Sequence, residues 1–174
     1  VFNKQSELSA FVGNIDPNTL SHLNTKHLIT KGYHSFVHKG STFIHLDNSN
    51  DGFRKTNATQ WTWIKNTINN IKTQNVFIFL TKPLTGKNGF TDADEAQLFK
   101  DLLTEQLAEK GKTVFVFYND ENTSCEIENG VRYIGTAGIK NVDVKNIATL
   151  VDTYQYILVT VNGDNVTYEI KKLF

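Results

Sequence analysis

Apolar and polar positions follow two patterns along this chain, and together they predict a mixed α/β fold. Apolar residues that are contiguous or that occupy every second position are typical of strands, and such segments lie at 33–37, 42–46, 76–80, 114–118, 154–161 and 166–170. Apolar residues at helical spacing predict helices over 60–73 and 92–110. Because a helix between two strands implies parallel neighbours, and tight turns imply antiparallel ones, we expect mixed sheets with helices outside.

Turn residues predict three hairpins. Gly40-Ser41 separates the first two strands, Asn129-Gly130 lies between two alternating segments, and a polar stretch at 162–165 separates the last two strands. The polar patch at 119–122, after the strand at 114–118, is where open α/β sheets commonly place chemistry; its simpler interpretation is a solvated turn.

Capping residues predict where the helices begin and end. Thr59 is expected to cap the first helix, whose stripe consists of Trp61, Ile64, Ile68 and Ile71. Asp92 and Glu95 have the spacing of a capping box at the start of the second helix, and Gly111 is expected to stop it. This helix is expected to bury Leu98, Phe99, Leu102, Leu103 and Leu107.

Two further segments are less regular. Asp16-Pro17 has the form of a helix start, and one face of a short helix would carry Leu20, Leu23, His27 and Leu28. Residues 48–57 are predicted to form a polar loop.

Composition narrows the class of protein. The chain has 174 residues, 39% of them apolar, which fits a single domain over 1–174 with a sizeable core. Lys and Arg total 18, as do Asp and Glu, so there is no basic excess for nucleic-acid binding. No stretch is long and apolar enough to be inserted in a membrane. The lone Cys125 rules out an internal disulfide, and we expect it to be inert packing on a strand.

Four segments in order carry a family resemblance. They are FVGNID at 11–16, STFIHLDNS with TQWTWIKNTI at 41–68, NVFIFLTKPL at 75–84, and KTVFVFYNDENTSCEIENGVRYIGTAG at 112–138. In the order and local sequence of these segments, the chain resembles the C-terminal two-thirds of a calcineurin-like metallophosphoesterase. The resemblance implies a four-layer sandwich, possibly truncated, in which two packed mixed β-sheets are flanked by helices and two metal ions lie in loops at the strand ends.

The departures from the family pattern concern its metal ligands. Asn14 matches the family's metal-bridging asparagine, but Ile15 follows where the family has its catalytic histidine. Thr81, or Lys82 in the shifted register, stands at the next histidine, and 118–121 replaces the Gly-His-x-His motif. An oxygen-rich metal site would therefore use Asn14, Asn119, Asp120 and Glu121. Lys82, beside Pro83, would bind an anionic substrate, and no catalytic residue is assigned.

Three hypotheses follow for function. The first is a degenerate, non-catalytic metallophosphoesterase-like domain that needs no cofactor and is a structural or binding module of a larger bacterial protein, on the cell surface or outside the cell. The second is an active phosphodiesterase or phosphatase that uses Mn, Zn, Mg or Ca ions. The third is a carbohydrate- or protein-binding module that uses an exposed tryptophan. For location, the cytoplasm is the alternative to the cell surface or the outside of the cell. The expected partners are the rest of a longer polypeptide, a second copy, or a surface ligand.

Overall fold

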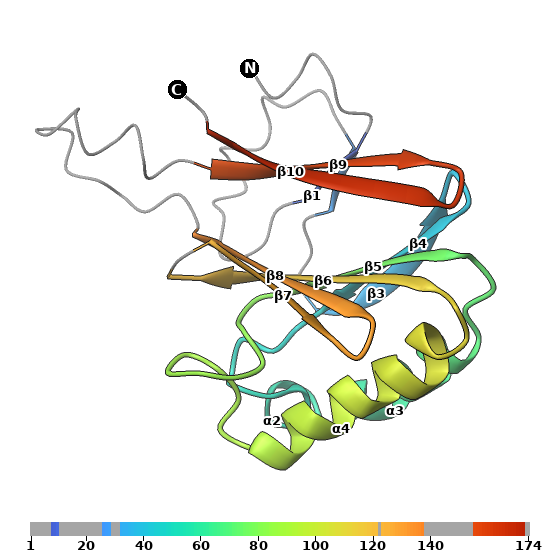
Figure 1. Cartoon of the computed structure of the whole chain (residues 1–174). Coiled ribbons are helices and arrows are strands. Elements are labelled where there is room, and N and C mark those ends of the chain that lie inside the picture. The colour runs from blue at the N-terminus through green and yellow to red at the C-terminus, as the bar shows by residue number, and fades with distance from the viewer. Residues whose placement is uncertain (1–7, 11–25, 29–31, 122, 138–154, 173–174) are drawn as a thin grey trace, which may run out of the picture.

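The computed structural model describes residues 8–10, 26–28, 32–121, 123–137 and 155–172. Most of these residues form three layers, with helices on one face of a six-stranded sheet and a two-stranded hairpin on the other (Figure 1). The prediction of a mixed α/β fold is confirmed. No helix in the described ranges has the length and apolar character needed to cross a membrane.

The central sheet has the strand order β3-β4-β5-β6-β8-β7. Its strands are β3 (His34–His38), β4 (Ser41–Leu46), β5 (Asn75–Leu80), β6 (Thr113–Asp120), β7 (Ser124–Glu128) and β8 (Val131–Ala137). Strands β4, β5, β6 and β8 are parallel neighbours, and β3 and β7 pair antiparallel at the two edges. The carboxyl ends of the parallel strands therefore meet at one side of the sheet.

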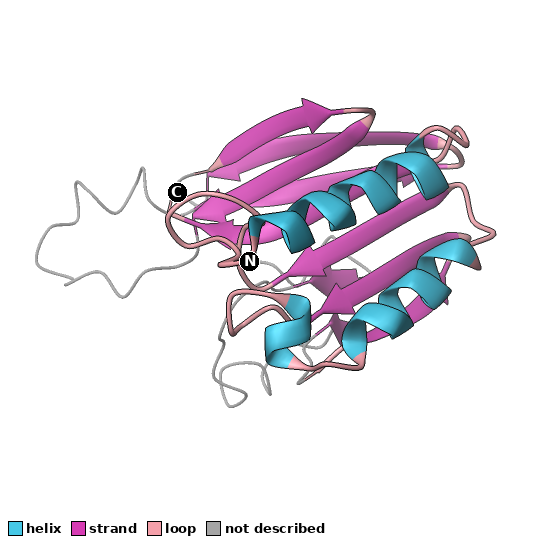
Figure 2. Cartoon of the chain, turned by 90° about the horizontal axis from the view of Figure 1, so that it is seen from below, coloured by secondary structure: helices cyan, strands magenta, loops and turns pink. Residues whose placement is uncertain are grey.

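The helices lie together on one face of this sheet (Figure 2). They are α2 (Phe53–Thr56), α3 (Gln60–Asn69) and α4 (Ala93–Leu103), the last continued by a π-helical turn η2 (Thr104–Ala108). The connections from β4 to β5 and from β5 to β6 both move in the same direction across the sheet. Because parallel crossovers have the same hand, their helices lie on the same side of the sheet. The core beneath them includes Ile44, Leu46, Phe53, Ile64, Phe99 and Leu107, each at most 1% exposed.

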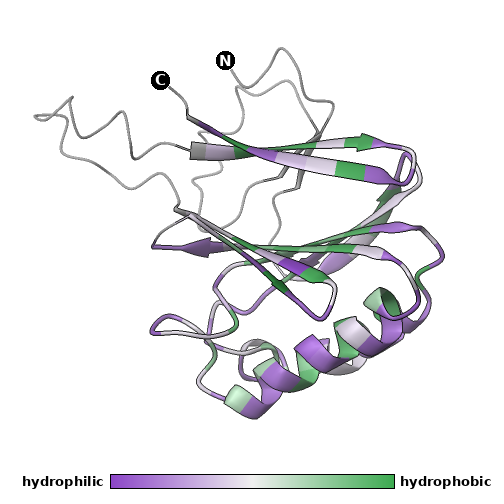
Figure 3. Ribbon diagram, viewed as in Figure 1, coloured by the Kyte–Doolittle hydropathy of each residue, from purple (hydrophilic) through white to green (hydrophobic). Residues whose placement is uncertain are grey.

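The hairpin of β9 (Gln155–Asn162) and β10 (Asn165–Lys172) covers the opposite face of the sheet. Its side chains pack on an aromatic cluster of Phe77, Phe79, Phe115 and Phe117 with Ile134. Because layers cover both faces, all six residues of β5 are buried, which explains its continuous apolar run. In Figure 3 hydrophobic residues recur along the strands, whereas α4 carries both hydrophobic and hydrophilic stretches.

Several local predictions are confirmed. All three hairpins form, and the one at Asn129-Gly130 has positive φ angles of 48° and 81°, as a tight two-residue turn requires. The Asp92 side chain caps α4 by accepting hydrogen bonds from the backbone N–H groups of Asp94 and Glu95. Gly111 follows the last helical turn with a φ of 77°.

Other local predictions are wrong. Thr59 makes no side-chain cap; its backbone N–H instead donates to Asn57 Oδ1 at 3.0 Å. The first helix ends at Asn69, and Leu98 is 47% exposed on the outer side of α4. The expected loop at 48–57 contains α2, whose Phe53 is fully buried between larger helices.

A short parallel pair, β1 (Leu8–Ala10) and β2 (Lys26–Leu28), precedes the main sheet in sequence. His27 and Leu28 therefore lie in a strand, and the helix expected there is wrong for these two residues. The rest of that predicted helix lies outside the described residues, as does Asn14.

Candidate functional site

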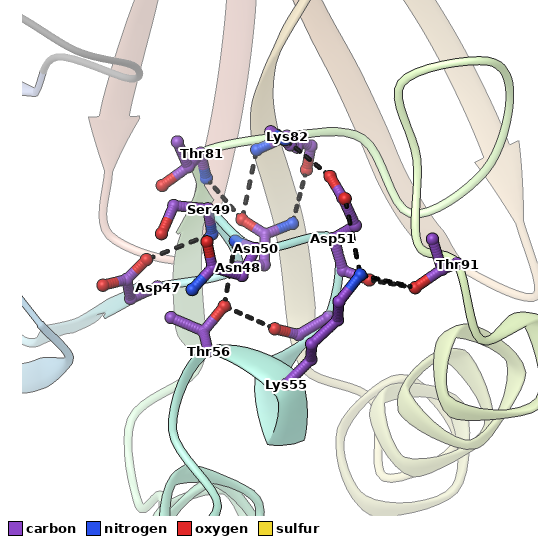
Figure 4. Close-up of polar contacts among 11 residues, drawn as sticks. Asp47, Asn48, Ser49, Asn50, Asp51, Lys55, Thr56, Thr81, Lys82 and Thr91 are labelled. Atoms are coloured by element: carbon purple, nitrogen blue, oxygen red, sulfur yellow. Dashed lines mark hydrogen bonds and ion pairs between the residues drawn. The ribbon is translucent and has the colours of Figure 1, made fainter.

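Polar side chains gather where β4 and β5 end, at the side of the sheet where open α/β folds usually bind ligands. We call this group the loop cluster; it consists of residues 47–52 with Lys55, Thr56, Thr81, Lys82 and Thr91 (Figure 4). Two loops meet here, one between β4 and α2 and one between β5 and α4.

Asn48 is the centre of the loop cluster and is fully buried. Its Oδ1 accepts hydrogen bonds from the backbone N–H groups of Thr81 at 2.8 Å and Lys82 at 3.1 Å. Its Nδ2 donates to the carbonyl oxygen of Lys82 at 2.8 Å. Both lone pairs of the amide oxygen are thus used in joining one loop to the other.

Asp51 lies between two lysines in the same cluster. Lys82 Nζ is 2.5 Å from one carboxylate oxygen, and Lys55 Nζ is 3.7 Å from the other. The hydrogen bond from Lys82 holds the pKa of Asp51 below its ordinary value. The carbonyl oxygen of Asp51 also accepts from the backbone N–H of Thr91 at 3.0 Å. The positive charge of Lys82, which sequence assigned to an anionic substrate, is therefore directed at Asp51.

Two buried side chains, those of Glu95 and Gln60, fix the loop between β4 and α2 by hydrogen bonds to the backbone at its two ends. Glu95 is 2% exposed, and its carboxylate accepts from the backbone N–H groups of Phe53 at 3.1 Å and Arg54 at 3.0 Å. Gln60 makes two hydrogen bonds to the backbone of Asp47: its Oε1 accepts from the Asp47 N–H at 2.8 Å, and its Nε2 donates to the Asp47 carbonyl oxygen at 2.6 Å. Glu95 therefore does not complete the capping box predicted with Asp92, because its carboxylate caps the start of α2 instead.

The predicted metal residues on the neighbouring strand are arranged differently from expectation. Asn119 and Asp120 are the last residues of β6, paired opposite Thr136 and Ala137, so the expected turn begins later. Adjacent strand residues point to opposite faces, which separates these two side chains. Asp120 Oδ1 accepts from the backbone N–H of Glu121 at 2.7 Å.

Glu121 is exposed, and its Oε1 accepts from Asn88 Nδ2 at 3.2 Å. Within the ranges that the structure describes, no group of three or more His, Cys, Asp or Glu side chains is placed to hold a metal ion. Asn14, the remaining predicted ligand, lies outside those ranges.

A histidine pair lies on the first hairpin, where His34 and His45 are opposite each other and their rings stack 5.6 Å apart. His45 Nδ1 is 2.9 Å from the carbonyl oxygen of Gly32, so Nδ1 carries the proton in this hydrogen bond. Burial lowers the pKa of both imidazoles, and the neighbouring His45 lowers that of His34 further. Both rings are therefore favoured in their neutral form.

Cys125 lies on the hairpin strand β7, as predicted, but it is exposed and is not part of the core. Its Sγ is 2.8 Å from the hydroxyl of Tyr168 on the covering hairpin.

A groove of about 490 Å³ lies between the edge strand β3 and the flank of α3. We call it the α3 groove. Trp63 lines it together with Ser35, Val37, Asn66, Asn70 and Lys72. The sequence hypothesis of a binding tryptophan did not identify this groove, because its two walls come from separate elements.

No protein-family profile and no curated protein matches this chain. Among solved structures, one titled "GAP50 the anchor in the inner membrane complex of Plasmodium" is similar over 59% of this chain, with 15% identity and a TM-score of 0.41. The match spans 35% of that chain.

Proposed function

We propose that this chain is a non-catalytic binding module built on a metallophosphoesterase-like scaffold. In this proposal the helical layer, the six-stranded sheet and the covering hairpin correspond to parts of the family's four-layer sandwich. The module would belong to a larger bacterial protein at the cell surface. The order of the four sequence segments supports a metallophosphoesterase-like scaffold. The hydrogen bonds within the loop cluster support the absence of catalytic activity.

The observation that carries the proposal is the bonding of Asn48. Hydrolysis at a two-metal centre requires carboxylate, imidazole and amide ligands that are free to bind ions. In the loop cluster the amide of Asn48 is used by the backbone of the adjacent loop, and the carboxylate of Asp51 is used by lysines. Glu95 is likewise engaged with backbone N–H groups. These groups stabilise loops, which is a structural role.

The test is hydrolysis of p-nitrophenyl phosphate and bis(p-nitrophenyl) phosphate with Mn²⁺, Zn²⁺, Mg²⁺ or Ca²⁺ added in turn. The proposal predicts that the purified chain releases p-nitrophenol no faster than a matched Asp120→Asn variant with any of these ions. Asp120 is chosen because its carboxylate lies at the end of β6, where the family's ligands would be. Metal-dependent release that is lost in Asp120→Asn would refute the proposal in favour of an active phosphoesterase.

A further inference from the structure

We propose that the α3 groove binds a neutral oligosaccharide. This inference rests on the proposed role as a binding module, and it specifies the ligand class and the site. It uses residues on the helical face of the sheet, and none of them belongs to the loop cluster.

One wall of the groove is a stripe along α3. Trp63, Asn66 and Thr67 line it at relative positions i, i+3 and i+4, so they share one side of the helix, and Asn70 lines it from the C-cap position just after the helix. The stripe combines one aromatic ring with amide and hydroxyl groups. Sugar rings present apolar C–H faces and a periphery of hydroxyl groups, and this combination of side chains matches both features.

The aromatic ring is held in place before any ligand arrives. Tyr33 packs against Trp63 with ring centroids 4.9 Å apart and planes tilted by 53°. The Tyr33 hydroxyl is in turn hydrogen-bonded to Thr59 Oγ1 at 3.0 Å. A ring fixed in this way loses little conformational entropy on binding, which favours affinity.

Charge and hydrogen-bonding capacity indicate a neutral ligand. No carboxylate lines the groove in the part of the chain that the structure describes, and Lys72 is the one charged residue among its lining side chains. Ser35, Asn66 and Lys72 bring hydroxyl, amide and ammonium groups to the lining, which can donate to or accept from sugar hydroxyls. The groove volume of about 490 Å³ is within the range of small-molecule sites.

The experiment measures tryptophan fluorescence during titration with cellohexaose, maltohexaose and chitohexaose. The chain has two tryptophans, and Trp61 packs toward Phe53 and Arg54 instead of lining the groove. A Trp61→Phe background therefore leaves Trp63 as the reporter. We expect a saturable change with at least one sugar, confirmed by calorimetry on the unmodified chain.

Two variants test whether binding occurs at the groove. Asn66→Ala removes an exposed amide, so it should fold normally; we expect about a fivefold loss of affinity. Trp63→Ala should weaken binding by roughly tenfold or more in calorimetry. Trp61→Phe should bind as the unmodified chain does.

Three results would overturn the inference. They are no saturable response to any of the three sugars, equal affinity in Asn66→Ala and the parent, or a fluorescence change that follows protein concentration without sugar, which would indicate a second copy in the groove. The hydrolysis assay separates this inference from the proposed function. Sugar binding without hydrolysis supports both, whereas metal-dependent hydrolysis refutes the non-catalytic role whatever the sugars do.

Discussion

Replacing Asn48 by alanine should destabilise the fold substantially, because this residue joins two loops from a fully buried position. The change removes three hydrogen bonds, to the Thr81 N–H, the Lys82 N–H and the Lys82 carbonyl. At a net value of about 1 kcal/mol each, the loss is about 3 kcal/mol in the free energy of unfolding. A domain of this size has a total of roughly 5–15 kcal/mol, so the loss is a large share.

Urea denaturation followed by tryptophan fluorescence measures this effect, with the slope checked for two-state behaviour. Asn50→Ala is the matched control, because Asn50 is exposed in the same loop and should change stability by less than about 0.5 kcal/mol. If Asn48→Ala is as stable as Asn50→Ala, Asn48 is not a structural link between the loops.

Three further predictions also concern the stability of the fold. Glu95→Ala should cost about 3 kcal/mol, since two backbone N–H groups lose a charged acceptor, and a loss below about 1 kcal/mol would contradict the capping of α2. Gly135→Ala should cost about 1–3 kcal/mol, because a Cβ there would lie 2.6 Å from a serine hydroxyl and 2.9 Å from a tyrosine ring; unchanged stability would show that the strands can shift. The lowered pKa values of His34 and His45 mean that the folded state binds fewer protons than the unfolded state. The stability that these two histidines contribute to the folded state is present above about pH 6.5 and is lost as the pH falls toward their lowered pKa values in the folded state. The melting temperature should therefore decline less on acidification in His34→Gln than in the parent.

The elements that sequence predicted correctly are those specified by local signals. The run of β5 is apolar at nearly every position because both of its faces are covered, and this pattern is visible without any knowledge of neighbours. The Asn129-Gly130 turn and the Asp92 cap depend on backbone angles and hydrogen bonds within a few residues. Such features depend only on the residues of the segment itself, so the local sequence is enough to predict them.

Helix α2 could not be predicted because its stability comes from distant residues. Its four residues contain one large apolar side chain, Phe53, and its first N–H groups are satisfied by Glu95, which is 42 positions away from Phe53 in sequence. The residues of 48–57 alone have the composition of a polar loop, and the carboxylate that stabilises a helix there comes from outside this segment. The same distance explains why sequence spacing places Glu95 in the cap of its own helix, α4, whereas its carboxylate caps α2.

The candidate sites were predicted in part. The sequence indicates a polar patch at 119–122, but β6 continues through Asp120, so the side chains of Asn119 and Asp120 alternate and do not converge. The sequence gives no sign of the α3 groove, although one hypothesis invokes a binding tryptophan, because a groove requires the lateral placement of β3 beside α3. Hydrophobic periodicity defines which side of a helix is buried, but it does not define what lies next to its exposed flank.

The most direct test of the non-catalytic account is metal-dependent melting of the purified chain, with elemental analysis of the same sample. An ion that binds only the folded state must raise the melting temperature. The account predicts no stoichiometric transition metal and no shift with Mn²⁺, Zn²⁺, Mg²⁺ or Ca²⁺ relative to chelator. Bound metal near two ions per chain, the content of a two-metal site, with a rise in melting temperature that Asp120→Ala abolishes, would contradict it.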